Sequence, residues 1–244
     1  MMKRLAAILV LLIFAAPAHA WGTLEDFTSG WNHVDDGDKL DVYANALVDD
    51  LYISEGTGAH HTKSFGAEHF GDFSCRWYGQ WDAAPSAWSS VCFGFADEVD
   101  YWPGVMDAGD SLWVRVSKGA SDVVADIVSE DDGSGTDSDD ITINTEDTNY
   151  YFQFSRSGTT ATLTIWTGGY ESSQVGTVNL TTTNTTFEYC HAYNVRNDDA
   201  GNVHWQVHDL DLSGAGEESH VGLLKQTLNN PVLHGATLSG GLYE

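Results

Sequence analysis

Alternation of apolar and polar residues is most regular between Phe70 and Trp102. In residues 70–81 the apolar side chains take every second position, and polar side chains take the positions between them. The apolar set is Phe73, Cys75, Trp77, Gly79 and Trp81, and the polar set is Ser74, Arg76, Tyr78 and Gln80. A period of two indicates a strand with one buried face. Residues 88–96 alternate in the same way, and the polar segment 82–86 between the two runs predicts a turn, so we expect a central hairpin.

The rest of the chain also has the pattern of an all-β protein. Short runs rich in β-branched residues are separated by Gly, Asn, Asp and Ser signals every 8–15 residues. This spacing is typical of a sandwich or barrel. Residues 40–53 predict two short strands or one bent strand, and the polar residues 54–63 predict a loop. No helical period of 3.6 occurs before residue 214.

The two ends of the chain differ from this pattern. Residues 1–20 have a basic start, an apolar run from Leu5 to Ala16 and the small-x-small ending Ala18-His19-Ala20. These features predict a cleaved signal peptide, and hence a secreted protein, extracellular or periplasmic, that is not held in a membrane after cleavage. The apolar run is shorter than the ~20 residues of a spanning helix, which argues against the alternative of a retained anchor.

Residues 214–244 form an appendage to a domain that spans residues 21–213. Apolar residues after Glu217-Glu218 predict a short helix that Pro231 ends, and the Gly-rich residues 232–244 follow as an extended segment. This tail can pack on its own sandwich or on a neighbouring molecule, which makes self-association a candidate property.

The charge of the chain restricts its partners. The sequence has 36 acidic and 10 basic residues, a formal net charge of −26. Such a surface repels nucleic acids and anionic membranes. Most of the acid is Asp in clusters, which suits solvated turns and, as the alternative, calcium ligation. No strict calcium-loop motif is present.

The three cysteines have no metal-binding pattern. Cys75 and Cys92 would lie on paired strands of the predicted hairpin, where a cross-strand disulfide needs the right register. The alternative is three buried thiols, Cys190 included.

The order of several short motifs resembles a concanavalin A-like (laminin-G-like) jelly roll over residues 24–213. The motifs are Asp26-Phe27, Gly71-Asp72-Phe73, Phe93-Gly94-Phe95-Ala96-Asp97, Tyr151-Phe152 with Arg156-Ser157-Gly158, Thr162-Leu163-Thr164-Ile165, and Trp205 with Val207-His208-Asp209-Leu210-Asp211-Leu212. The resemblance implies two antiparallel sheets and the binding, or hydrolysis, of carbohydrate.

Aromatic and acidic residues at the ends of the predicted hairpin are the candidate ligand-binding residues. They are Trp81, Trp88, Trp102, Asp97, Glu98 and Asp100. Tryptophan rings stack on the apolar faces of sugars, and carboxylates accept hydrogen bonds from hydroxyls. The alternative is that these three rings belong to the core. For two other tryptophans, Trp77 and Trp113, we favour the core because of their large apolar area.

The resemblance also implies a Ca²⁺ ion, because related sandwiches hold calcium through loop aspartates. Asp26, Asp209 and Asp211 are the candidate ligands, since the two ends of the domain should pair in one sheet. The alternative is that Asp209 and Asp211 simply face outward from the sheet.

Catalysis is the weaker interpretation. Family 16 glycoside hydrolases carry Glu-x-Asp-x-x-Glu along one strand, and here Glu98 and Asp100 match its first two acids. The second Glu is missing, so a double displacement lacks its proton donor. We therefore expect a secreted lectin-like protein that binds a glycan or polysaccharide without catalysis. The alternatives are an extracellular assembly subunit and a family 16-like hydrolase.

Overall fold

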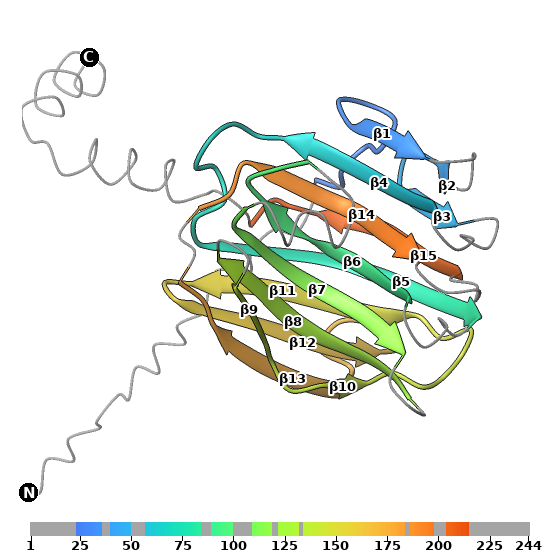
Figure 1. Cartoon of the computed structure of the whole chain (residues 1–244). Coiled ribbons are helices and arrows are strands. Elements are labelled where there is room, and N and C mark those ends of the chain that lie inside the picture. Colours follow the sequence, from blue (N-terminus) through green and yellow to red (C-terminus); the bar gives the residue numbers. More distant parts are fainter. Residues whose placement is uncertain are drawn as a thin grey trace, which may run out of the picture.

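The computed structural model describes residues 23–35, 40–49, 57–83, 89–99, 109–118, 122–131, 134–183, 186–197 and 204–214 (Figure 1). Within these ranges fifteen strands form two antiparallel sheets, and no segment is a helix that could cross a membrane. The expected all-β, two-sheet antiparallel sandwich is confirmed. The expected signal peptide and all of the tail except Gly214 lie outside the described residues.

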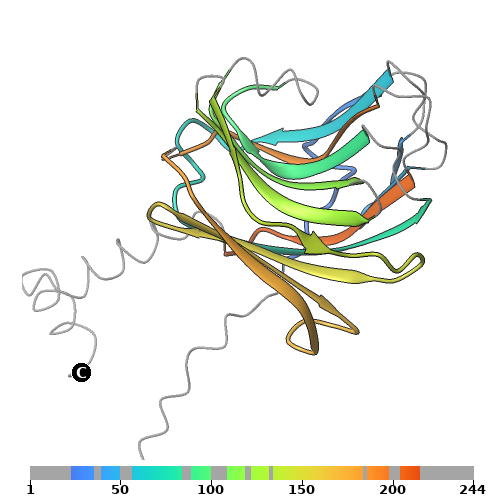
Figure 2. The same ribbon diagram turned by 60° about the horizontal axis from the view of Figure 1, so that its bottom comes forward.

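The two sheets stack as layers (Figure 2). The eight-stranded sheet has the order β1-β4-β14-β6-β7-β8-β10, with β9 paired to β8. Its strands are β1 (Asn32–Asp35), β4 (Thr57–Ser64), β6 (Ser89–Ala96), β7 (Ser111–Lys118), β8 (Val123–Asp131), β9 (Ser134–Asp137), β10 (Ile141–Thr142) and β14 (Tyr189–Asn197). The seven-stranded sheet has the order β13-β12-β11-β5-β15-β3-β2. Its strands are β2 (Leu40–Val42), β3 (Ala46–Asp49), β5 (Phe73–Ala83), β11 (Tyr150–Ser157), β12 (Thr160–Thr167), β13 (Ser173–Thr181) and β15 (His204–Asp211).

The core lies between the layers and is centred on Trp77. The inward set of β5 is buried as its alternation predicts. The Trp77 ring stacks on Phe93 of the opposite sheet, with 4.0 Å between ring centroids, and lies parallel to Phe152 of its own sheet at 5.1 Å. Such aromatic contacts add to the free energy gained by burying apolar area.

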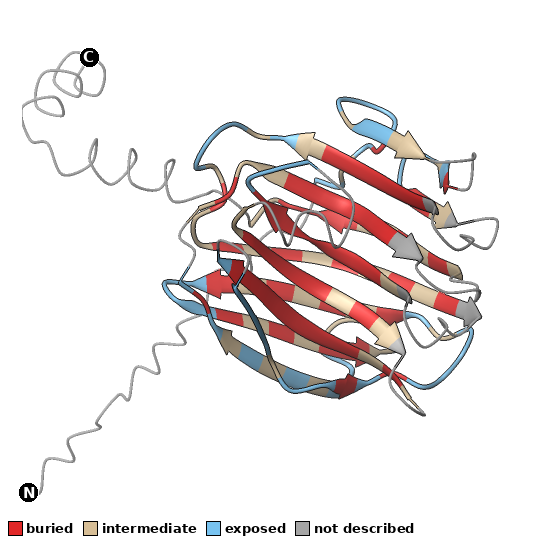
Figure 3. Ribbon diagram, in the orientation of Figure 1, coloured by how far each residue is buried: buried red, intermediate tan, exposed pale blue. Residues whose placement is uncertain are grey.

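The two sheets differ in their outer faces. Burial alternates along β11 and β12 of the seven-stranded sheet, whereas β6, β8 and β14 of the eight-stranded sheet are buried at nearly every position (Figure 3). A second apolar cluster of Cys92, Ala96, Trp113 and Val128 lies on that sheet, separate from the main core. The expected burial of Trp77 and Trp113 is confirmed, although Trp113 belongs to this second cluster.

The predicted central hairpin is wrong. β5 pairs with β11 and β15, and β6 pairs with β14 and β7, so the two strands belong to opposite sheets. A period of two requires only that each strand has an inward face, and two strands that face each other across a core satisfy it equally well. The cross-strand disulfide fails for the same reason: Cys75, Cys92 and Cys190 are all free and buried.

The predicted loop at residues 54–63 is also wrong in its second half. β4 is a strand between β1 and β14, and its His60, His61 and Thr62 are buried. The hydrophobic pattern does not predict this strand, because several of its buried side chains are polar, two of them imidazoles.

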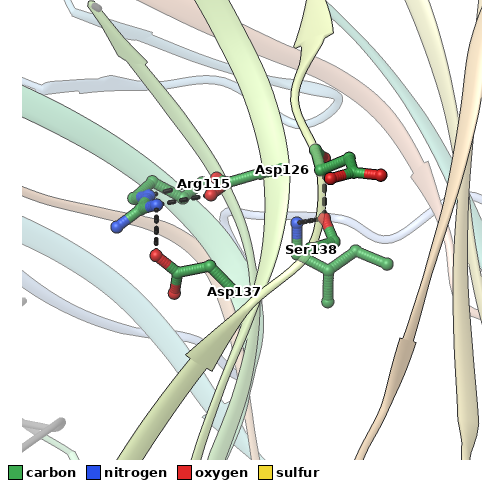
Figure 4. Close-up of polar contacts among 6 residues, drawn as sticks. Arg115, Asp126, Asp137 and Ser138 are labelled. Atoms are coloured by element: carbon green, nitrogen blue, oxygen red, sulfur yellow. Dashed lines mark hydrogen bonds and ion pairs between the residues drawn. The ribbon is translucent and has the colours of Figure 1, made fainter.

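A partly buried ion pair secures one end of the eight-stranded sheet. The Arg115 guanidinium of β7 binds the Asp126 carboxylate of β8 and reaches Asp137 of β9 at 3.1 Å (Figure 4). Asp126 is only 1% exposed. Its burial raises the pKa of this carboxyl, and the adjacent guanidinium opposes the rise. Ser138, which follows β9, accepts a hydrogen bond from the Ile127 amide of β8. These contacts hold the short strand β9 against β8.

We predict that Trp77→Ala lowers the free energy of unfolding by roughly 3–5 kcal/mol, because it leaves a cavity between the sheets. Tyr43→Ala is the matched control, since Tyr43 is 53% exposed, and should change stability by less than about 0.5 kcal/mol. Urea denaturation followed by tryptophan fluorescence measures both. Equal midpoints for the two variants would contradict the central role of Trp77.

Candidate functional site

A cavity of about 590 Å³ opens on the outer face of the seven-stranded sheet. We call it the tyrosine pocket, and its lining residues are Leu24, Arg76, Tyr78, Asn149, Tyr151, Tyr170, Asp209 and Asp211. They come from β5, β11 and β15, from the residue that precedes β11, from the turn between β12 and β13, and from Leu24, which pairs with Asp211 in an isolated bridge. Volumes of this size are typical of sites for small ligands.

Register in the sheet brings the tyrosines together. Tyr78 of β5 lies directly opposite Tyr151 of β11 and His208 of β15. The Tyr78 ring stacks on the His208 ring at 4.7 Å with an interplanar angle of 5°, and Tyr151 lies 5.6 Å from Tyr78. Tyr170 meets the Tyr151 ring edge to face at 5.2 Å. Flat aromatic surfaces are therefore part of the wall of the pocket.

Arg76 is held firmly at one side of the pocket. Its Nε and Nη2 atoms donate to Oε1 of Gln153 at 3.1 and 2.8 Å, and Nη2 also donates to Glu171 at 3.4 Å. The guanidinium lies 4.8 Å from the centroid of the Tyr170 ring. The favourable contact between a cation and an aromatic face fixes this tyrosine over the sheet.

A β-bulge in β15 places two carboxylates at the pocket. Val207 and Leu210 are both buried although they are three residues apart, so the strand changes its inward parity between them. Asp209 makes this possible with a positive φ of 51°, a conformation that Asp adopts more easily than most residues. Asp209 accepts a hydrogen bond from Asn45 at 3.0 Å, and Asp211 accepts one from the Ser213 amide at 2.8 Å.

Partial burial shifts the pKa values of three titratable side chains on this face. Burial, followed by the nearby Asp209 carboxylate, raises the pKa of Tyr78. Burial also raises the pKa of Tyr170, although Arg76 opposes the change. Burial lowers the pKa of His208. Near neutral pH Tyr78 and Tyr170 therefore keep their hydroxyl protons, and each of these hydroxyls can donate and accept a hydrogen bond.

Sequence reasoning missed the aromatic part of this site. The alternation of residues 70–81 predicts that Arg76 and Tyr78 face outward, and a large aromatic side chain at an outward position is the available signal. Tyr151 and Tyr170 gave no separate signal, because only the pairing of β5 with β11 brings them to the same face.

Trp81 is not a ligand platform, and the prediction is wrong for this residue. Its side chain belongs to the core and is only 3% exposed. Its indole N–H donates to the carbonyl oxygen of Ile143 at 3.0 Å. Because Trp81 is an inward residue of β5, the alternation that buries Trp77 buries it too.

The other predicted ligand residues are not part of the tyrosine pocket. Asp97 and Glu98 follow β6 of the eight-stranded sheet and are exposed. Desolvation of its carboxyl, together with the nearby Asp110 carboxylate, raises the pKa of Asp97. Trp88, Asp100 and Trp102 lie outside the described residues.

The structure places the predicted calcium ligands in different surroundings. Asp209 and Asp211 line the tyrosine pocket, whereas the Asp26 carboxylate accepts hydrogen bonds from the amide and hydroxyl of Thr28 at 3.0 and 2.6 Å. In the described part of the chain, no group of three or more His, Cys, Asp or Glu side chains is arranged to hold a metal ion. The Ca²⁺ ion that the fold resemblance implied stays a prediction.

The buried outer face of the eight-stranded sheet contains a neutral histidine. His191 Nε2 donates to the carbonyl oxygen of Glu98 at 3.0 Å, and its Nδ1 accepts from the Asn194 amide at 3.2 Å. The His191 and Trp113 rings pack edge to face, with 4.9 Å between their centroids. Burial lowers the pKa of His191 to about 3, although the hydrogen bond to Glu98 opposes the shift. Both ring nitrogens are used by the uncharged imidazole, so this histidine serves the fold.

Comparison with known proteins connects the chain to a fold through structure alone. No protein-family model matches the sequence, and no curated protein is similar enough in sequence to count as a relative. Among solved structures, the Ca²⁺-bound exoplasmic/lumenal domain of VIP36 superposes with a TM-score of 0.54 and 7% identity, over 78% of this chain and 88% of that domain. The legume lectin-like domain of Entamoeba histolytica gives 0.55 and 7%, over 75% and 89%.

The carbohydrate recognition domain of Emp47p is a third similar structure, with a TM-score of 0.53 and 9% identity over 77% of this chain and 92% of that one. VIP36 is also known in forms bound to mannose, Man2 and Man3GlcNAc. These neighbours are legume-lectin-like, and the expected concanavalin A-like jelly roll is confirmed as the fold.

We predict that His191 makes stability fall as the pH drops from about 6.5 to 5. The unfolded chain binds a proton near the ordinary pKa of ~6.5, whereas the folded chain does not until a much lower pH, so acid favours unfolding by up to ~1.4 kcal/mol per pH unit for this residue. His191→Gln removes this contribution. Urea denaturation at pH 7, 6 and 5 should show a smaller loss of stability in the variant than in the wild type.

The comparison between His191→Gln and the wild type isolates the effect of His191 on the pH dependence of stability. Other groups, such as Asp97, whose raised pKa acts in the opposite direction, are present in both proteins. Equal losses of stability in the variant and the wild type would show that His191 is not kept neutral by the fold.

Proposed function

We propose that this concanavalin A-like sandwich is a secreted protein that binds a glycan or polysaccharide, without catalysis, in the tyrosine pocket. The observation that carries the proposal is the convergence of three tyrosine rings and two carboxylates on one cavity. Sites for small ligands combine apolar and aromatic walls with a few polar groups that fix orientation.

The chemistry of this wall suits a sugar ring. A pyranose has an apolar C–H face, which packs on a flat aromatic surface such as Tyr151. Its hydroxyls are donors as well as acceptors, and Asp209 and Asp211 are acceptors at the same cavity. The tyrosine hydroxyls and the Asn149 amide add groups that both donate and accept.

The comparisons support this proposal at the level of the fold. Structures with the same sandwich include a carbohydrate recognition domain and a lumenal domain bound to mannose-containing ligands. The jelly roll alone does not determine a ligand, so the proposal depends on the pocket of this chain.

The proposal of binding without catalysis rests on the incomplete acid motif. Glu98 and Asp100 lack the third carboxylate that would complete a Glu-x-Asp-x-x-Glu strand. Hydrolysis with retention needs both a nucleophile and a proton donor on either side of the glycosidic bond.

Assembly into a larger structure is a second candidate function, and β13 is the observation that favours it. This strand forms one edge of the seven-stranded sheet, is nine residues long and has no charged side chain. Uncharged edges pair readily with other strands. A second strand could come from residues 214–244 of a neighbouring molecule. Size-exclusion chromatography with and without these residues tests this, and a monomer in both cases would exclude it.

Export is part of the proposal and makes a direct prediction. If residues 1–20 act as a signal peptide, the mature protein begins at Trp21. N-terminal sequencing, or the intact mass, of protein recovered from the medium or periplasm should show this end. A mature chain that still begins at Met1 would contradict cleavage.

We predict that Tyr151→Ala weakens glycan binding by roughly tenfold, because it removes an aromatic surface from the pocket. Tyr151→Phe should retain most of the affinity, since it keeps the ring. Tyr43→Ala is the matched control, because Tyr43 is an exposed tyrosine outside the pocket. A glycan array followed by titration calorimetry measures all three.

Equal binding by Tyr151→Ala and the wild type would exclude the tyrosine pocket as the site. A protein that binds no glycan on the array would exclude the lectin function altogether.

A further inference from the structure

We infer that the tyrosine pocket selects its ligand by charge: sugars that are neutral or carry an amine bind, and sugars that carry a carboxylate, sulfate or phosphate are excluded. This inference rests on the proposed function, and it adds the chemical class of glycan that the site takes.

The balance of charge at the pocket is negative. Asp209 and Asp211 line it, and Glu171 lies beside it through its ion pair with Arg76. Among the described lining residues, Arg76 is the one cation. His208 stacks beneath Tyr78 and stays uncharged near neutral pH, because burial lowers its pKa. An anionic sugar in the pocket therefore meets two lining carboxylates and one guanidinium that is already paired with a third carboxylate.

Arg76 is not available as a clamp for an anion. Its Nε and Nη2 atoms already donate to Gln153 and Glu171, and one face of the guanidinium is covered by Tyr170. An arginine that recognises a carboxylate or sulfate usually does so with two parallel N–H donors. Here that geometry would require Arg76 to give up hydrogen bonds that hold the pocket wall together.

Both aspartates line the pocket and keep unused acceptor positions, although Asp211 is only 4% exposed. The structure gives each of them local donors, Asn45 for Asp209 and Ser213 for Asp211, and in both cases the Oδ1 atom accepts. A carboxylate has about four acceptor positions, so the aspartates keep capacity for hydroxyl or ammonium donors. The same oxygens repel an anionic group.

The tyrosine rings act in the same direction as the aspartates. The face of an aromatic ring is negative and attracts cations, as the contact between Arg76 and Tyr170 already shows. An ammonium group on a sugar would gain from Tyr78 and Tyr151 as well as from the carboxylates. A like charge at contact distance costs about fivefold in affinity in water, and more where water is displaced.

An array that displays neutral, amine-bearing, uronic-acid, sialylated and sulfated glycans, probed with the full chain at low ionic strength, tests the inference. We expect bound glycans to be neutral or amine-bearing. Binding confined to acidic glycans would overturn the charge selection and leave the lectin function standing. Binding to no glycan would overturn both.

Asp209→Asn tests whether the pocket is the origin of the selection. Asn tolerates the positive φ at this position, and its Oδ1 can still accept from Asn45. We expect this variant to bind acidic glycans at least three- to fivefold better than the wild type does. Asp139→Asn, an exposed aspartate outside the pocket, changes the net charge equally and should leave the preference unchanged.

Equal preferences in Asp209→Asn and Asp139→Asn would show that overall charge, and not the pocket, excludes anions. Asp211→Asn is the second pocket variant, since its amide oxygen can still accept from Ser213. It should shift the preference in the same direction as Asp209→Asn, and failure of both pocket variants to shift it would overturn the inference.

Discussion

The stacking of Trp77 on Phe93 across the core is the contact on which the rest of the structure depends. It joins β5 of one sheet to β6 of the other, and Phe152 extends the stack along the seven-stranded sheet. Because side chains alternate along a strand, fixing Trp77 inward fixes its neighbours outward. The hydrophobic core thereby determines which residues lie on the outer face of β5.

The tyrosine pocket follows directly from this constraint. Arg76 and Tyr78, on either side of Trp77, both project from the outer face of β5. The pairing of β5 with β11 then supplies Tyr151, and the bulge in β15 turns Asp209 and Asp211 toward the same cavity. The bulge interrupts the regular pairing of β15. It keeps Leu210 buried between the two carboxylates of Asp209 and Asp211. Irregular strands of this kind often adjoin functional sites.

The two sheets have different physical tasks. Strands β6, β8 and β14 of the eight-stranded sheet are buried at nearly every position, and the buried His191 hydrogen-bonds to Glu98 and Asn194. The seven-stranded sheet is alternately buried and accessible, so its outer face can meet a ligand (Figure 3). The formal net charge of −26 agrees with the proposal that the pocket on this face takes uncharged or cationic sugars.

The sequence by itself determined the all-β class, the inward and outward sets of β5 and the burial of Trp77, because these follow from the two-residue period and from apolar area. It did not determine which strands pair. The alternation of β5 and β6 is the same for a hairpin and for two strands that face each other, and the buried histidines of β4 gave no apolar signal. The tertiary structure therefore decided that Tyr78, Tyr151 and Asp209 meet. These residues are far apart in the chain, and only the register of paired strands brings them to one cavity.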